Sequence, residues 1–181
     1  MAADLYDLIK KCINYCNTVF EGKILNFAIT TNAYLLTPEK AKFLIDNNTA
    51  ILVSLDGPKE IHNKNRKYAG DGSGTFDTVY KNLEKIRQQL PEYYEKITYN
   101  SVVDPANDCS KINNFFNCDM FRDRMVKTAA LQPTVGKRAY YSEEYMSSSK
   151  KNQLFALLAK AGVLDISDIP TIAKNYLERI N

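Results

Sequence analysis

Along this chain, segments with apolar side chains spaced three and four residues apart alternate with short apolar, β-prone runs. This alternation predicts helices and strands in succession. A spacing of three and four residues predicts a helix over residues 5–20, and the apolar stripe of that helix includes Cys12 and Cys16. Because a cysteine inside such a stripe usually behaves as a small buried hydrophobe, we expect both thiols to lie in the core. The same spacing predicts a helix over residues 75–90 that ends at Pro91.

Four short β-prone runs predict strands, at residues 24–31, 50–55, 97–103 and 126–131. Helices are expected between them: one begins at Thr37-Pro38, one covers residues 75–90, and a short one is capped by Asp108. Strands that alternate with helices pair in parallel through right-handed crossovers. The sequence therefore predicts an α/β fold with about four parallel strands, either a doubly wound sheet or a stretch of a (β/α) barrel.

The C-terminal part has a different pattern. From about residue 142 it lacks strand-like runs, and helices are predicted over residues 148–161 and 167–180. No low-complexity tract or internal repeat separates these helices from the rest of the chain. We therefore expect one domain over residues 1–181, with a helical tail.

Composition narrows the class of protein. The chain has 181 residues, 45% of them hydrophobic, and a net charge of +3 from 24 basic and 21 acidic side chains that are scattered without a basic block. Nucleic acid is therefore not indicated as a partner. No apolar run reaches the roughly 20 residues of a membrane span and no signal peptide is evident, so we expect a cytoplasmic protein without a membrane partner. The four cysteines form no CxxC pair, and we expect reduced thiols and no metal site.

Hydrogen-bonding side chains stand where each predicted strand ends. In parallel α/β folds ligands bind at the carboxyl ends of the strands, because loops there lead into helix N-termini. The same residue types also form caps and turns, so each residue alone has both interpretations, and their agreement across four strands favours a ligand site. Period-two alternation adds a polar stripe along the third strand. The strand-end residues are Thr31, Asn32, Ser54, Asp56, Asp104 and Gln132, and the stripe is Thr98, Asn100 and Asp104.

Residues 56–74 are predicted to form a long loop. It contains the only histidine of the chain, His62, which is either a structural hydrogen-bonding residue or, with Asp56 or Asp104, an acid-base pair of a small hydrolase. The glycine-rich tip at residues 70–74 lacks the lysine of a phosphate-binding P-loop. A turn or a flexible lid is the expected structure of that tip.

Three segments, in this order and at this spacing, resemble a known family. They are ITTNAYLLT at residues 29–37, SLDGPKEIHNKNR at residues 54–66 and GSGTF at residues 72–76. Together they are similar to the radical S-adenosylmethionine (SAM) enzymes, and most similar to the SPASM-type branch that contains sulfatase-maturing enzymes and peptide thioether maturases. The resemblance is clear over about residues 5–105.

The resemblance implies a partial (β/α) barrel that binds S-adenosylmethionine, with a [4Fe-4S] cluster in a full-length parent. It also implies that the cofactor-binding residues Thr31, Asn32, Ser54, Asp56 and Arg66 hold the ribose and the methionine carboxylate. Hydroxyl, amide and acid groups suit a ribose diol, and an arginine fork suits a carboxylate. The implied substrate of the parent is a side chain of a peptide or protein, and no residue is assigned to catalysis.

The sequence also departs from the family. The CxxxCxxC loop that holds the cluster, and the Gly-Gly-Glu motif, are expected to precede this chain. Cys12 and Cys16 mimic the first half of the cluster loop, but Val19 stands at the third cysteine position. Cys109 and Cys118 lack the spacing of the auxiliary-cluster domain, and Asn63 stands where many relatives have aspartate.

These departures predict the central portion of a radical SAM enzyme that is inactive alone, because cluster ligands are missing. The alternative is a non-catalytic α/β binding or scaffold module derived from the same fold. An opened half-barrel exposes strand edges, so self-association is also expected.

Overall fold

Four strands form one parallel sheet at the centre of the molecule. The computed structural model describes residues 2–106, 109–131 and 140–179. In these residues the strand order is β1–β2–β3–β4, and all three pairings are parallel. This arrangement confirms the predicted α/β fold with four parallel strands. The strands are β1 (Phe27–Thr31), β2 (Thr49–Ser54), β3 (Ile97–Val103) and β4 (Val126–Ala130).

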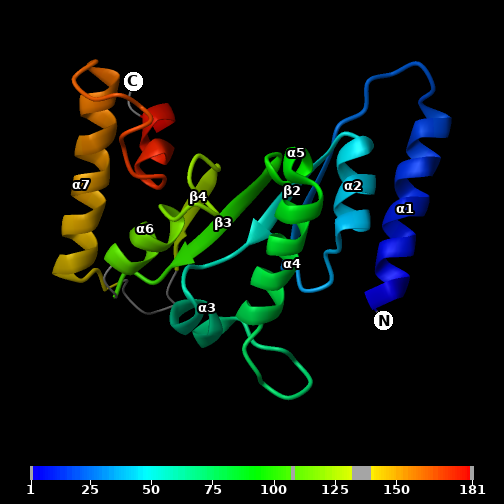
Figure 1. The fold of residues 1–181 in the computed structure, drawn as a ribbon, viewed down its shortest axis with the longest axis horizontal. Coiled ribbons are helices and arrows are strands. Elements are labelled where there is room, and N and C mark those ends of the chain that lie inside the picture. Colours follow the sequence, from blue (N-terminus) through cyan, green and yellow to red (C-terminus); the bar gives the residue numbers. More distant parts are fainter. Residues whose placement is uncertain (1, 107–108, 132–139, 180–181) are drawn as a thin grey trace.

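Helices make the connections between strands and form both ends of the molecule, with α1 at one end and α7 at the other (Figure 1). Among the described residues, no helix is both long and apolar enough to cross a membrane. The helices are α1 (Ala2–Val19), α2 (Pro38–Asp46), α3 (Lys59–Asn65), α4 (Phe76–Gln89), α5 (Pro91–Tyr94), α6 (Ser110–Phe116), α7 (Glu143–Lys160) and the 3-10 helix η1 (Ala173–Arg179).

Two predicted boundaries in the tail differ from the structure. Helix α7 begins at Glu143 rather than at residue 148, because the Ser142 side chain accepts the N–H of Tyr145 and caps the helix there. In place of a helix over residues 167–180, the structure has the short 3-10 helix η1. The predicted cap Asp108 lies outside the described residues.

One face of the sheet is buried and the other is open. Along β3 every second residue from Ile97 to Val103 is buried, whereas Thr98, Asn100 and Val102 are half-buried. The outer strands follow the same alternation, since Ala28 of β1 and Lys127 of β4 are exposed. We call the second face the open face of the sheet. Its positions are Ala28, Thr30, Ala50, Leu52, Ser54, Thr98, Asn100, Val102, Lys127 and Ala129.

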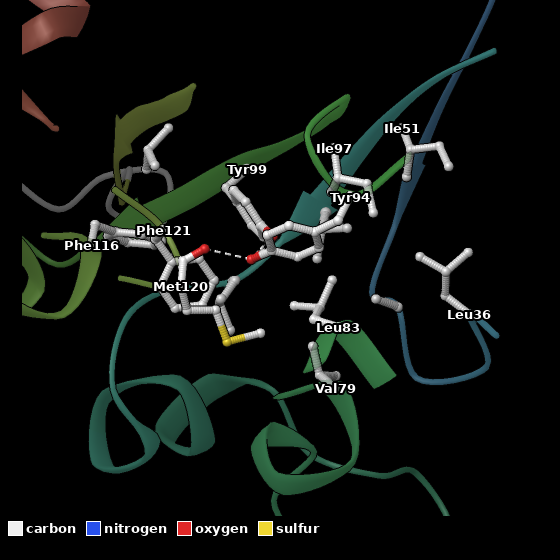
Figure 2. Packing of buried hydrophobic residues seen from close by; sticks show 14 of the residues in the cluster. Leu36, Ile51, Val79, Leu83, Tyr94, Ile97, Tyr99, Phe116, Met120 and Phe121 are labelled. Carbon is white, nitrogen blue, oxygen red and sulfur yellow. Dashed lines mark hydrogen bonds between the residues drawn. The ribbon is translucent and has the colours of Figure 1, made fainter. Parts of the chain in front are cut away.

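The buried face packs against the crossover helices. Figure 2 shows Val79 and Leu83 of α4 beneath the residues of the sheet, with Tyr94, Tyr99 and Met120 beside them. The buried Tyr99 hydroxyl donates to the Tyr94 hydroxyl over 3.0 Å, and Tyr94 donates to the Met120 carbonyl oxygen over 2.6 Å. These hydrogen bonds satisfy two phenol groups that would otherwise cost free energy in an apolar core.

Helix α1 is less buried than its apolar stripe predicts. Ile13 is its only buried residue among those whose side chains the structure describes, while Leu5 is 60% exposed. The prediction that both cysteines of this helix lie in the core is wrong for Cys12, which is exposed, and Cys16 is half-buried. The stripe is wider than the contact, because Ile9 and Ile13 pack against the core whereas Leu8 and Val19 are about half exposed.

The predicted long loop at residues 56–74 is also wrong in part, because it contains the seven-residue helix α3. Pro58 precedes this helix in an extended conformation, and no side chain caps the helix start, so the usual cap signal is missing. The glycine-rich tip is a turn, in which Tyr68 N–H donates to the Ser73 carbonyl over 2.7 Å.

Candidate functional site

The carboxyl ends of the four parallel strands lie along one edge of the sheet, which is where ligands bind in parallel α/β folds. Ser54 ends β2, and the strand register places it beside Asn100 of β3 on the open face. Ser54 is 9% exposed and Asn100 is half-buried. Asn100 was predicted as part of a polar stripe but not as a site residue. The signal that would have added it is the pairing register between β2 and β3.

Asp56 and Arg66 meet just beyond the end of β2. Arg66 Nε donates to Asp56 Oδ2 over 2.6 Å, and Nη2 donates to Oδ1 over 2.9 Å. The Asp56 side chain is 6% exposed and that of Arg66 is 25% exposed. A bidentate, largely buried pair of this kind is a strong charge-assisted interaction with a defined geometry. The structure therefore brings together two of the predicted site residues.

The remaining polar groups of Asp56 are also bound within the protein. Its Oδ1 accepts the N–H of Val102 over 2.9 Å, and its carbonyl oxygen accepts the Ser101 hydroxyl over 3.2 Å. Its own N–H donates to Nδ1 of His62 over 3.4 Å. Asp56 thus links the end of β2 to the end of β3.

His62 is an internal residue of α3 and is 1% exposed. Since its Nδ1 accepts from Asp56, Nε2 carries the proton and faces the Thr75 hydroxyl at 3.1 Å, which in turn donates to the Arg66 carbonyl over 3.1 Å. Burial lowers the pKa of His62 from 6.5 to about 4, the Arg66 charge also lowers it, and the Asp56 charge opposes the change. His62 is therefore neutral and enclosed at pH 7, and the geometry does not support a hydrolase in which His62 acts on a substrate.

Thr31 and Asn32 lie at the end of β1 and stabilise a turn. Thr31 Oγ1 accepts the N–H of Ala33 over 3.1 Å, and Asn32 Oδ1 accepts the N–H of Tyr34 over 3.1 Å. Ala33 has a φ of 55°, a left-handed conformation that these local hydrogen bonds support. Tyr34 then stacks on Tyr68, with ring centroids 5.5 Å apart. This stack links the β1 turn to the loop that follows Arg66.

One other predicted strand-end residue, Asp104, directly follows β3. Asp104 Oδ1 accepts the N–H of Ala106 over 2.9 Å, which is a local turn contact. Gln132 lies outside the described residues. Thr98, which belongs to the predicted polar stripe, lies on the open face and donates to the Ile51 carbonyl over 3.2 Å.

A cavity of about 500 Å³ lies at the opposite, amino end of β4, away from these residues. Cationic side chains line it, but Lys174 pairs with Asp123 over 2.9 Å and Arg124 lies 3.7 Å from Glu95. Lys127 also lines the cavity, but the cavity lies at the amino end of β4 and therefore adds no chemistry to the strand ends.

The described part of the chain holds no group of three or more His, Cys, Asp or Glu side chains arranged for a metal ion. All four cysteines are free: Cys12 and Cys16 lie on α1, whereas Cys109 and Cys118 flank α6. An iron-sulfur cluster needs converging thiolates, so the residues described here do not fit one. S-adenosylmethionine fits better, because Ser54 and Asn100 supply neutral polar groups and Arg66 supplies a cation just beyond the end of β2.

The fold is a parallel half-barrel with polar strand ends and a buried acid-arginine pair, which is the architecture expected of a radical SAM enzyme. Comparison with known families gives the same class. The model of the Radical SAM superfamily matches residues 2–112, and the chain belongs to this family. The resemblance predicted from the sequence is thereby confirmed. S-adenosylmethionine and the [4Fe-4S] cluster are the cofactors of this family.

Curated relatives point to one branch of the family. The chain is 32% identical over 118 residues to the cysteine-type anaerobic sulfatase-maturating enzyme of Clostridium novyi, which covers 64% of this chain and 30% of that enzyme. It is 38% identical over 84 residues to the serine-type anaerobic sulfatase-maturating enzyme of Bacteroides thetaiotaomicron, covering 46% of this chain and 20% of the relative. The chain therefore matches less than a third of the length of either relative.

A solved structure shows the same fold. Native anSMEcpe with bound AdoMet and Kp18Cys peptide superposes with a TM-score of 0.65 at 24% sequence identity, over 87% of this chain and 44% of that chain. At this identity the similarity establishes the fold, and it confirms the predicted partial barrel.

Proposed function

We propose that this chain forms the central part of a radical SAM enzyme that modifies a side chain of a peptide or protein. The observation that carries the proposal is the Ser54–Asn100 pair at the carboxyl end of an open parallel sheet, followed by the Asp56–Arg66 pair just beyond β2, in a chain of this family. Relatives named as sulfatase-maturating enzymes, and a structural neighbour that holds a peptide, support the choice of substrate class.

In this proposal the open face is one wall of the S-adenosylmethionine site, and the turn at the end of β1 is another part of that site. Ser54 contributes a hydroxyl group from the open face, Thr31 and Asn32 contribute hydroxyl and amide groups toward the ribose from the β1 turn, and Arg66 faces the methionine carboxylate. The turn contacts of Thr31 and Asn32 each use one side-chain oxygen as acceptor, so the Thr31 hydroxyl proton and the Asn32 amide N–H groups are left for a ligand. In this family the [4Fe-4S] cluster and S-adenosylmethionine together supply the radical that abstracts hydrogen.

The cofactor site is tested by titrating the ¹⁵N-labelled chain with S-adenosylmethionine and following amide and side-chain chemical shifts. We expect saturable shifts at Ser54, Asn100 and Arg66 and none at Gly162 or Val163, which follow the C-terminal end of α7. Absence of any saturable shift would contradict the site, and would favour the alternative of a non-catalytic binding or scaffold module.

The proposal includes the expectation that the 181-residue chain is inactive by itself. Anaerobic reconstitution with iron and sulfide is expected to give no [4Fe-4S] spectrum and no 5′-deoxyadenosine. A brown protein that produces 5′-deoxyadenosine would refute this expectation. The reading frame upstream separates the alternatives, because a continuous frame that encodes CxxxCxxC indicates an enzyme rather than a scaffold.

We also place the protein in the cytoplasm. Its four cysteines are all free, which suits a reducing compartment.

A further inference from the structure

The Asp56–Arg66 pair uses only part of the hydrogen-bonding capacity of the arginine. A guanidinium has five N–H groups in a fixed plane. Arg66 gives Nε–H and one Nη2–H to the carboxylate of Asp56. Three N–H groups remain on the outer edge of the guanidinium, two on Nη1 and one on Nη2. That edge has the geometry of a second bidentate site for a carboxylate.

The carboxylate of Asp56 is fixed on the opposite side of the pair. Oδ1 is shared between Arg66 and the Val102 N–H, and the backbone of Asp56 is held by Ser101 and His62. Asp56 is 4% exposed, so a ribose hydroxyl reaches it only if these contacts break. This arrangement differs from the direct ribose contact that the sequence predicted for Asp56.

The backbone of Arg66 is fixed as well. Its N–H donates to the His62 carbonyl over 3.0 Å, and its carbonyl accepts the Thr75 hydroxyl over 3.1 Å and the Thr75 N–H over 3.2 Å. His62 Nε2 contacts the same Thr75 hydroxyl. The arginine is therefore held at its backbone by α3 and the start of α4, and at its side chain by the end of β2.

We propose that Asp56 is a positioning residue that orients the outer edge of Arg66 toward the carboxylate of the bound cofactor, and that Asp56 does not itself contact the cofactor. This inference rests on the proposed function, because it assumes that a ligand with an amino-acid carboxylate occupies the open face. Without Asp56, the long arginine side chain populates several rotamers, and ordering it costs free energy each time the ligand binds.

Decarboxylated S-adenosylmethionine, which lacks only the carboxylate, is the discriminating probe. Asp56→Asn keeps the size of the side chain and an oxygen for the Val102 N–H, but removes the charge. We expect this variant to lower the affinity for S-adenosylmethionine about tenfold and to leave the affinity for the decarboxylated analogue within about twofold of wild type. Arg66→Ala is expected to have the same selective effect, and adding Asp56→Asn to it is expected to cause no further loss.

Asp77→Asn is the matched control, because Asp77 forms an exposed pair with Lys59 over 2.6 Å. It is expected to change neither affinity. Equal loss of both ligands in Asp56→Asn would indicate a merely structural role and would overturn the inference. Unchanged affinity for both would also overturn it.

A second measurement does not need a ligand. In ¹⁵N spectra of the free chain we expect the Arg66 Nε–H to exchange slowly with water in wild type and at least about tenfold faster in Asp56→Asn, because the charge-assisted hydrogen bond is lost. Equal exchange rates would overturn the positioning role whatever the binding data. Slow exchange of the Arg66 Nε–H in a wild-type chain that binds neither S-adenosylmethionine nor its decarboxylated analogue would instead contradict the proposed function.

Discussion

At the scale of single residues, the acid at the end of β2 shows how a strand-end side chain can serve a site indirectly. Asp56 is chemically suited to a ribose, yet its carboxylate is occupied by Arg66 and Val102. The sequence identified both Asp56 and Arg66 as site residues, because both belong to the family-like segment at residues 54–66 and both have side chains suited to the cofactor. It did not show that they contact each other, since they stand ten positions apart in the chain with helix α3 between them.

His62 makes the stability of the protein depend on pH. Its pKa is lowered to about 4 by burial, whereas a histidine in the unfolded chain has its ordinary pKa of 6.5. As pH falls from 6.5 toward 4 the unfolded chain binds a proton that the folded chain does not. The free energy of unfolding therefore decreases over this window, by roughly 3 kcal/mol at most, and is unaffected by this group above it.

Urea denaturation of wild type and His62→Gln at several pH values checks this prediction. Because other carboxyl groups also titrate below pH 5, the measured quantity is the difference between the two proteins. We expect the variant to be less stable at pH 7 but to lose less stability than wild type between pH 6.5 and 4. Parallel pH curves for the two proteins would show that His62 is not buried in its neutral form.

At the scale of elements, a side chain of α3 caps the N-terminus of α4. Thr75 precedes α4 but makes no side-chain cap, and Asn63 of α3 supplies it, with Oδ1 accepting the Phe76 N–H over 3.1 Å. The resemblance leads us to expect aspartate at this position in relatives, and an aspartate would offer an equivalent acceptor. The departure from the family pattern at Asn63 therefore preserves the contact.

Gly74 leaves room for this cap. A Cβ at Gly74 would lie 2.1 Å from Cγ of Asn63, so Gly74→Ala forces the Asn63 side chain away from the start of α4. We expect Gly74→Ala to lower the free energy of unfolding by about 1 to 2 kcal/mol, the usual cost of losing an N-cap. Urea denaturation of the single variant measures this loss.

The Asn63→Ala background is the control for that mechanism. Asn63→Ala already lacks the cap, so adding Gly74→Ala is expected to cost clearly less than it does in wild type. If Gly74→Ala costs the same in both backgrounds, then the cap is not what this substitution disturbs.

At the scale of the whole molecule, the two edges of the sheet differ. The outer edge of β4 meets η1, and the Asn175 amide donates to the Val126 carbonyl there. The strand at the other end of the described sheet is β1. Beside it lies a groove lined partly by Leu5, Tyr6 and Ile9 of α1. Within the described sheet β1 has a strand partner on one side only, and an edge strand with apolar neighbours favours pairing with another chain.

We therefore keep the prediction of self-association and assign it to β1. Sedimentation velocity over a concentration series is expected to show dimers or larger species in wild type. Ala28→Lys places a charge on the edge strand and is expected to shift the protein toward monomer. Ala129→Lys, at another exposed alanine, on β4, is the matched control and is expected to leave association unchanged. A wild-type protein that is monomeric throughout, or equal effects of both substitutions, would contradict the assignment.

The sequence by itself determined the order of strands and crossover helices, because hydrophobic periodicity is a local property that survives without tertiary contacts. It also determined the family and the residue types at the strand ends, since those depend on motifs. Helix α3 was missed because its start carries no side-chain cap, and the burial of α1 was overestimated because periodicity does not show how much of a stripe finds a partner.

Only the tertiary structure decided which polar groups contact one another. Asn100 lies beside Ser54 because of strand register. His62 is neutral because α3 buries it against the end of β2 and Thr75. Hydrogen-bond partners and desolvation depend on residues distant in the chain, so no local pattern encodes them. For that reason the sequence predicted Asp56 as a cofactor ligand, whereas the folded chain leads us to propose it as the residue that orients Arg66.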